Sequence, residues 1–368
     1  MILSAQDRSG GENPLADTIT ARTPRTKSQW AWRIALFLLI LLAGEWYVKW
    51  NPYYHKAFIA AARHSIGSSI VSGKSDLAPA VSVSAAWHYA VAYFLAVWQA
   101  VILGVVVGAA VQVLIPRDWL LRILGHRRAS SVIAAGALSV PAMMCTCCSA
   151  PIVVGLRRQN VSAGSALAFW LGNPVLNPAT IVFAGFVLGW NFALVRILFG
   201  LILVLCVGLL ANRFWGDRGV PEAAQAAVAQ LSAADERPVW QRFFAQLGRI
   251  SASVLPVYIL LVLAVGAFRS WLFPVIGLAH ADGFLWVLGL ALTGTLFVIP
   301  TAGEVPIIQT MMHYGLGLGP AFALLLTLPA ISAPSAAMVW RHFPKKALLF
   351  AGASTFVVGL IAGLAGML

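Results

Sequence analysis

Long apolar runs alternate with short polar stretches along most of the 368-residue chain. A helix that spans a bilayer needs about 20 mostly apolar residues, and most of the runs reach that length. The pattern therefore predicts an all-α polytopic membrane protein. The runs occupy residues 30–48, 88–115, 131–156, 161–190, 191–212, 247–268, 284–311, 317–340 and 347–367.

The stretches around these runs define the expected divisions of the chain. Residues 1–29 are polar and rich in Ser, Thr and Pro, which is typical of disorder, and they lack the apolar core of a cleaved signal peptide. Residues 30–85 combine an extra transmembrane helix with an interfacial segment that holds aromatic and cationic residues such as Trp50. The remaining divisions are two transmembrane repeats at 86–212 and 247–368 and a cytoplasmic linker at 213–246.

The second transmembrane repeat matches the first at a constant offset of 155 residues. This offset carries Pro151 onto Pro306 and Pro174 onto Pro329, and the apolar runs fall on their counterparts. Matching breaks in both halves indicate an internal duplication, which is a common plan of secondary transporters. We expect broken or re-entrant helices that meet near the membrane midplane.

The charges indicate that the two repeats are inverted. Arginines precede the run at 131–156, and Arg157 and Arg158 follow it directly. Cytoplasmic loops carry an excess of Lys and Arg, so both ends of this run are expected in the cytoplasm, and the run would enter and return as a hairpin. The alternative is nine full crossings with parallel repeats, in which the runs at 131–156 and 284–311 each cross once and Arg157 and Arg158 lie outside. The inverted arrangement places the N-terminus in the cytoplasm and the C-terminus on the outer side.

Composition supports the membrane assignment and excludes other classes. Charged residues make up 10% of the chain and hydrophobic residues 60%, whereas soluble domains carry about a quarter charged residues. The net charge of +13 lies largely in the loops, so it indicates orientation in a bilayer and not nucleic-acid binding. No metalloprotease, phosphate-binding or hydrolase motif is present, so we expect neither an enzyme nor a cofactor. The expected partners are the lipid bilayer and a small thiol-reactive cargo. The sequence leaves open whether the protein forms a homo-oligomer.

Three of the four cysteines lie in the run Cys145-Thr146-Cys147-Cys148, which two prolines bracket. Prolines interrupt helices, and irregular backbone at membrane depth occurs only where it is buried in protein or lines a cavity. On a helix, Cys145 and Cys148 would share a face with Cys147 turned away; in an unwound loop, all three could converge. Convergent thiolates bind trivalent arsenicals, Cu(I) and other soft species. The run is a candidate cargo or soft-metal site, with tight packing of small residues as the structural alternative, and Cys206 is expected in the core.

Two Asn-Pro pairs, which begin at Asn173 and Asn177, predict a second break. A residue before proline is pushed out of the helical region, so a regular helix cannot continue there. The two carboxamides can face a cargo near the midplane or cap half-helices, and both roles can coexist. In the second half, Ser332 takes the place of Asn177.

Glu304 is the one acidic residue in the apolar runs of the second half, and Thr301 lies close to it in the chain. Glu304 corresponds to Ser149, directly after the thiols, so we expect these residues at one binding site. An isolated carboxylate is costly in a membrane, so Glu304 should be protonated, paired or functional, and we assign it to proton coupling. Arg196 is a candidate partner, although we expect it to reach the outer interface instead.

The motif Met-Met-Cys-Thr-Cys-Cys-Ser-Ala-Pro at 143–151, followed by the Asn-Pro breaks, resembles a family of predicted permeases. That family includes efflux permeases for trivalent organoarsenicals such as methylarsenite. The resemblance covers residues 88–368 and implies that Cys145, Cys147 and Cys148 engage the cargo. The adjacent pair at 147–148 departs from the family's pattern of separated cysteines, and the N-terminal 85 residues lie outside the resemblance.

These features favour a multi-pass permease of a bacterial inner membrane that expels a soft, thiol-reactive species such as a trivalent organoarsenical. Thiols would capture the cargo from the cytoplasm, rocking of the two halves would release it outside, and the proton gradient would drive the cycle. A transporter of a reduced-sulfur compound is the first alternative. The second is a membrane thiol protein that carries electrons or delivers metal without any transmembrane flux.

Overall fold

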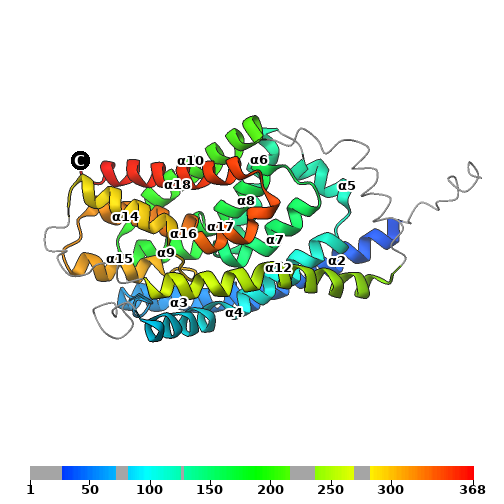
Figure 1. Cartoon of the computed structure of the whole chain (residues 1–368), viewed down its shortest axis with the longest axis horizontal. Coiled ribbons are helices and arrows are strands. Elements are labelled where there is room, and N and C mark those ends of the chain that lie inside the picture. The colour runs from blue at the N-terminus through cyan, green and yellow to red at the C-terminus, as the bar shows by residue number, and fades with distance from the viewer. Residues whose placement is uncertain (1–26, 72–81, 126–127, 216–236, 269–281) are drawn as a thin grey trace, which may run out of the picture.

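The computed structural model of the protein describes residues 27–71, 82–125, 128–215, 237–268 and 282–368, and every regular element in them is a helix. This confirms the predicted all-α class (Figure 1). The α-helices are α2 (Lys27–Glu45), α3 (Asn51–Arg63), α4 (Val83–Val113), α5 (Arg117–Leu120), α6 (Ala129–Ser139), α7 (Thr146–Arg158), α8 (Ala163–Val175), α9 (Pro178–Val187), α10 (Trp190–Trp215), α12 (Val239–Ala267), α14 (Phe284–Leu296), α15 (Glu304–His313), α16 (Leu318–Ala330), α17 (Ala333–Val339) and α18 (Lys345–Ala365).

Seven helical segments of the described chain are long and apolar enough to cross a membrane. This confirms a polytopic membrane protein, because each reaches the roughly 20 residues that a crossing requires. The segments are Ala31–Arg63, Val83–Val113, Ala163–Val187, Trp190–Trp215, Val239–Ala267, Leu318–His342 and Lys345–Ala365.

The N-terminal helix is longer than the sequence predicts. Instead of ending near residue 48, α2 continues through a π-helical turn, η1 (Trp46–Trp50), into α3, so the expected interfacial aromatic residues are part of one helix. Helical structure also enters the expected linker, since α10 ends at Trp215 and α12 begins at Val239. The disorder predicted for residues 1–29 is wrong for residues 27–29, which begin α2. Residues 1–26 and the middle of the linker, 216–236, lie outside the described residues.

The segment that carries the thiols returns to the end at which it began. Ser162, after α7, donates from its backbone N–H and from its hydroxyl to the carbonyl of Leu124, before α6, at 3.4 and 3.3 Å. The corresponding segment of the second half, from α14 to α15, also returns to the end at which it began. Gly317, after α15, lies beside the side chain of Asp282, before α14. Each segment is therefore a hairpin of two short helices that contains a break.

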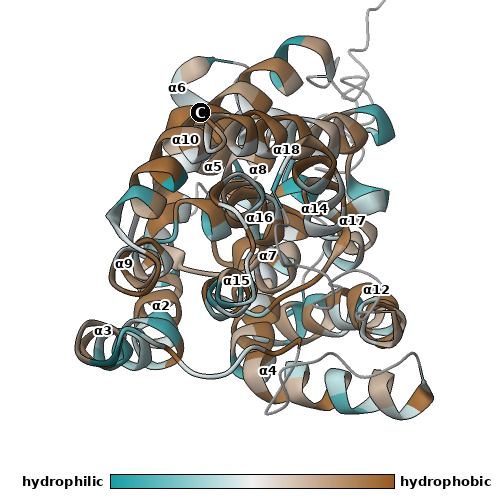
Figure 2. Cartoon of the chain, turned by 90° about the vertical axis from the view of Figure 1, so that its left-hand side faces the viewer, coloured by the Kyte–Doolittle hydropathy of each residue, from teal (hydrophilic) through white to brown (hydrophobic). Residues whose placement is uncertain are grey.

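The two hairpins lie toward opposite ends of the helix bundle, α6 and α7 at the right of Figure 1 and α14 and α15 at the left. Viewed along the bundle, α7, α15 and α16 occupy the middle, and α3, α4, α10, α12 and α18 are among the helices around them (Figure 2). Helix bounds recur at the predicted offset: α8 begins at Ala163 and α16 at Leu318, and both have 13 residues. The inverted relation of the halves stays a prediction, which these positions support.

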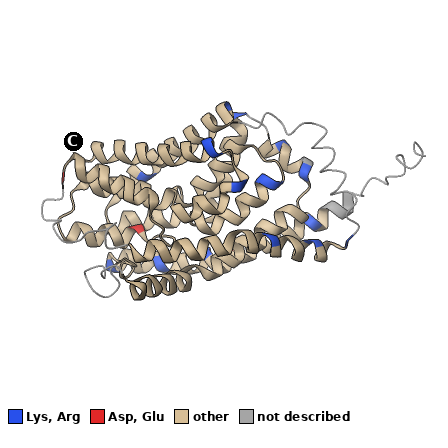
Figure 3. Cartoon of the chain, in the orientation of Figure 1, with Lys and Arg blue, Asp and Glu red and all other residues tan. Residues whose placement is uncertain are grey.

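Basic residues are distributed unevenly along the bundle. Most of the Lys and Arg positions lie in the right-hand half of Figure 3, the end at which the first hairpin enters. The buried charged residues of the described chain are Glu45, Lys49, Arg196 and Glu304, each at most 4% exposed. Charges at that depth in a membrane protein mark functional positions, so these four direct attention to the centre of the bundle.

Candidate substrate site

Cys145 and Cys148 face each other at the start of α7. The chain leaves α6 through a 3-10 turn that contains Pro141, and Met143 adopts a left-handed conformation with φ of 46°. Cys145 then caps the new helix: its sulfur accepts from the backbone N–H of Cys148 at 3.4 Å, and the two Sγ atoms lie 2.7 Å apart. The i, i+3 spacing on a helix brings the two side chains together, so the break presents a pair of free thiols.

Cys147 points elsewhere, as expected for a residue that follows the first helical position. Its Sγ lies 3.9 Å from the hydroxyl of Ser332 at the start of α17. Two buried tyrosines complete this second environment, since Tyr258 donates to Tyr93 at 3.0 Å and both interact with Cys147. The three thiols therefore do not converge, and no group of three His, Cys, Asp or Glu in the described residues is placed to hold a metal ion.

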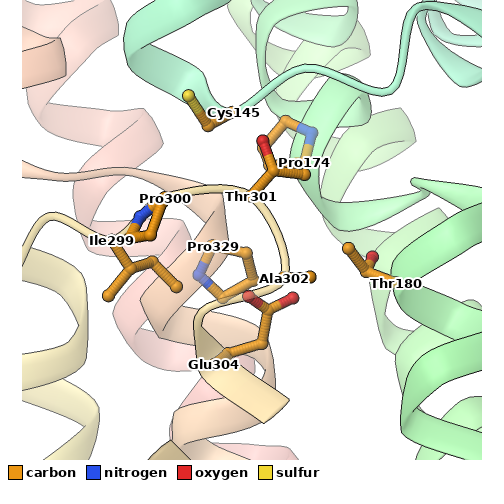
Figure 4. Close-up of a pocket in the computed structure, with 9 residues that line it drawn as sticks. All are labelled: Cys145, Pro174, Thr180, Ile299, Pro300, Thr301, Ala302, Glu304 and Pro329. Carbon is orange, nitrogen blue, oxygen red and sulfur yellow. The ribbon is translucent and has the colours of Figure 1, made fainter. Parts of the chain in front are cut away.

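A small pocket lies where the two breaks meet. Its volume is about 10 Å³, which is room for about one water molecule. Figure 4 shows Cys145 on one side, Glu304 on the other and Thr301 between them on the loop before α15. The other residues that line the pocket are Pro174, Thr180, Ile299, Pro300, Ala302 and Pro329. A cargo larger than water therefore requires these elements to separate.

Arg196 of α10 holds the carboxylate of Glu304. Its Nη1 lies 2.7 Å from Oε1 of Glu304, and the two side chains are 0% and 1% exposed. The other guanidinium nitrogens donate to the carbonyls of Pro174 and Val175 at 2.8 and 3.0 Å, which caps the C-terminal end of α8. The expectation that Arg196 reaches the outer interface is wrong, because the break after α8 leaves carbonyls that need donors inside the bundle.

The other predicted site residues of the breaks bond mainly to nearby backbone. Asn173 accepts from the N–H of Met144 at 3.4 Å and so joins α8 to the thiol break, whereas Asn177 caps α9 by accepting from the N–H groups of residues 179 and 180. Ser149 donates to the carbonyl of Cys145 at 3.0 Å, and Ser332 caps α17. Of these four residues Asn177 and Ser332 cap helices, whereas Asn173 and Ser149 lie inside α8 and α7. Only Cys145, Thr301 and Glu304 of the predicted set line the pocket.

Lys49 is a site residue that the sequence reasoning missed. It lies in the π-helical turn η1 and donates from Nζ to Oγ1 of Thr301 at 3.0 Å. Trp50, beside it, donates to the carbonyl of Pro141 at 2.9 Å and fastens the N-terminal helix to the thiol break. A charged pair, Glu45 and Lys49, inside a long apolar helix was the available signal.

The prediction that Cys206 lies in the core is wrong, because its side chain is exposed on α10.

Comparisons with known proteins agree with this architecture. A family model described as a predicted permease matches residues 56–171 and 128–367. UPF0718 protein YraQ of Escherichia coli (strain K12) is 51% identical over 347 residues, which cover 92% of this chain and 95% of YraQ. UPF0718 protein MJ0584 of Methanocaldococcus jannaschii is 26% identical over 288 residues, or 60% of this chain and 78% of that protein. No solved structure matches the chain. Because the family model begins at residue 56, the expectation that the N-terminal 85 residues lie outside the resemblance is wrong for residues 56–85.

Proposed function

Because the chain belongs to a family of predicted permeases, we propose that it is a secondary transporter that expels a soft, thiol-reactive species, with trivalent arsenicals, organoarsenicals included, as the leading class. The observation that carries this proposal is the pair of free thiols at a helix break, 2.7 Å apart, of which Cys145 lines a pocket between two hairpins. Two thiols that face each other suit a trivalent arsenic or other soft centre. Soft-metal cargo would use this pair, with Cys147 outside it.

Capture of a trivalent arsenical by this pair is chemically simple. A dihydroxy arsenical exchanges its two hydroxyl groups for the sulfurs of Cys145 and Cys148 and releases two water molecules. The reaction needs no oxidant. When the pocket opens to the other side, two water molecules hydrolyse the As–S bonds, which restores both thiols and the dihydroxy arsenical. The opposed hairpins supply two elements whose relative movement can expose the pocket alternately, as in transporters built from repeats.

The proposed direction of transport is outward, with capture of the cargo on the cytoplasmic side. The basic end of the bundle fits the cytoplasmic face under the positive-inside rule. In that orientation the thiol hairpin enters from the cytoplasm of a bacterial cell, and the N-terminus lies inside. The C-terminus follows α18 to the opposite, outer end of the bundle (Figure 1).

Glu304 supplies a means of proton coupling. Oε1 is paired with Arg196, and Oε2 has no hydrogen-bond partner among the described residues although the carboxylate borders the pocket. Protonation of Glu304 would release Arg196 and loosen the contact between α10 and the second hairpin. We expect Glu304→Gln to transport at a rate that no longer depends on an imposed proton gradient. Unchanged gradient dependence in this variant would remove Glu304 from the coupling mechanism.

The transport proposal is tested in everted membrane vesicles from a strain that lacks other arsenical exporters. Wild-type vesicles should accumulate methylarsonous acid, and a Cys145→Ser/Cys148→Ser variant with equal expression should not. Cys147→Ser is the matched control, because its sulfur lies outside the pair, and it should retain most of the uptake. Equal uptake by the wild type and the double variant would contradict thiol capture. Thiosulfate offered to the same vesicles tests the alternative of a reduced-sulfur cargo.

A further inference from the structure

Lys49 is held at the thiol site by more than one contact. Its side chain is 4% exposed, within a span of 33 residues that can cross a membrane. Nζ donates to Thr301 at 3.0 Å and lies 5.3 Å from the ring centre of Tyr53. The π-helical turn, an insertion that is frequent at functional sites, lies at this position of the N-terminal helix.

Among the described residues, no carboxylate lies within ion-pair distance of this ammonium group, although Glu45 attracts it from farther away. Arg196 and Glu304 neutralise each other. Glu45, four residues before Lys49, is also buried, yet neither of its carboxylate oxygens has a hydrogen-bond partner among the described residues. Among the described residues, the Lys49 ammonium donates one hydrogen bond, to the hydroxyl of Thr301. An ammonium group has three N–H donors, so one hydrogen bond to a hydroxyl leaves it able to donate to a further polar oxygen.

The acceptor of Lys49 also borders the thiol. Thr301 lines the same pocket as Cys145, and Figure 4 shows both side chains there. Lys49, Thr301 and Cys145 thus form a row that ends at the sulfur pair. An oxygen that remains on an atom bound to both sulfurs can accept a hydrogen bond from the Thr301 hydroxyl or the Lys49 ammonium. The carboxylate of Glu304, on the opposite side of the pocket, has no proton to donate to such an oxygen.

Different arsenicals leave different groups on the captured atom. Arsenous acid, As(OH)₃, loses two hydroxyls as water on binding two thiols and retains one oxygen. Methylarsonous acid, CH₃As(OH)₂, loses both hydroxyls as water and retains only a methyl group. A donor pair beside the thiols therefore distinguishes the two bound forms.

We propose that Lys49 is a specificity-determining residue of the thiol site, which donates to the oxygen that a trivalent oxyacid of arsenic or antimony keeps after capture by Cys145 and Cys148. The inference rests on the proposed function and extends it to a cargo class, the oxygen-bearing trivalent species. It also assigns the N-terminal helix a direct part in cargo binding.

Equilibrium binding of arsenite and of methylarsonous acid to the purified full-length protein tests this role, with bound arsenic measured by mass spectrometry. Lys49→Met should weaken arsenite binding about tenfold or more, the value of one hydrogen bond to a charged donor, and change binding of methylarsonous acid less than about twofold. Lys49→Arg should recover arsenite binding. Lys56→Met, which removes the same charge seven positions later on the N-terminal helix, should match the wild type. Lys49→Gln, which keeps a polar group for Thr301 but has no charge, serves if the methionine variant does not fold.

The selectivity between the two probes separates the possible results. An equal loss of both probes in Lys49→Met, or no loss of arsenite, would overturn the role of Lys49 while thiol capture stands. Equal binding by the wild type and by Cys145→Ser/Cys148→Ser would instead overturn the proposed thiol site, and the role of Lys49 with it.

Discussion

In the first half, the break between α6 and α7 presents two thiols, whereas the corresponding break between α14 and α15 presents a hydroxyl and a carboxylate. The offset of 155 residues carries Ser149 onto Glu304 and Cys145 onto Pro300, so the two hairpins share a backbone plan but not a chemical one. They border a single pocket. Under the proposed function, the two hairpins have different roles: the first holds the cargo, and the second balances charge around it.

The largest expected effect concerns the thiol hairpin. Cys145→Ser/Cys148→Ser should weaken binding of methylarsonous acid by at least about a hundredfold, because two As–S bonds are lost and hydroxyl groups are poor ligands for a soft centre. Cys147→Ser should change it by less than about threefold. Equilibrium binding to the purified variants measures both values. A loss in Cys147→Ser as large as in the double variant would erase the distinction between the thiols.

The second hairpin should respond most to loss of its ion pair. Arg196→Met leaves Glu304 as an uncompensated buried acid and removes donors from two carbonyls, so we expect a loss of about 3–5 kcal/mol of stability. Thermal unfolding in detergent should show that Arg196→Met/Glu304→Gln is more stable than Arg196→Met alone. If the double variant is no more stable than the single one, the pair does not contribute as the geometry implies.

Close packing of α4 against α7 should matter next. A side chain at Gly104 would overlap the carbonyl oxygen of Cys148, so Gly104→Ala should destabilise the protein by about 1–3 kcal/mol and displace the thiol pair. Gly352→Ala on α18 is the control, since nothing lies within 4 Å of its added carbon. Thermal unfolding and arsenical binding should both decline in the first variant and not in the second. A harmless Gly104→Ala would show that α4 can move away from α7 at little cost.

The smallest effect is expected at the Asn-Pro break. Asn177→Ala removes the cap of α9 and should cost about 1 kcal/mol, whereas Asn177→Asp keeps an acceptor for the two backbone N–H groups. The change in unfolding temperature measures this difference. A loss of arsenical binding in Asn177→Asp, without a loss of stability, would instead give the carboxamide a direct role in cargo binding.

Much of the fold could be predicted because the bilayer imposes a strong pattern. Apolar runs of sufficient length located the crossings, and prolines located the breaks at 140–145 and 176–177. The continuation of the first helix to Arg63 was less accessible, since aromatic and cationic residues suit both a bilayer boundary and a helix packed against other helices.

The site was predicted only in outline. Sequence spacing gave two arrangements for the thiols, and the start of α7 at Thr146 selects the one in which Cys147 turns away. The pairing of Arg196 with Glu304 and the contact of Lys49 with Thr301 join residues 108 and 252 positions apart, and no local pattern specifies such contacts. Both follow from tertiary packing, where one buried polar group requires another.

X-ray absorption at the arsenic edge tests most directly whether the pair Cys145 and Cys148 holds the cargo. For the purified protein loaded with methylarsonous acid, we predict two sulfur neighbours and one carbon neighbour around arsenic, unchanged in Cys147→Ser and with fewer sulfurs in Cys148→Ser. Three sulfur neighbours that fall to two in Cys147→Ser, or no sulfur neighbour at all, would contradict the account.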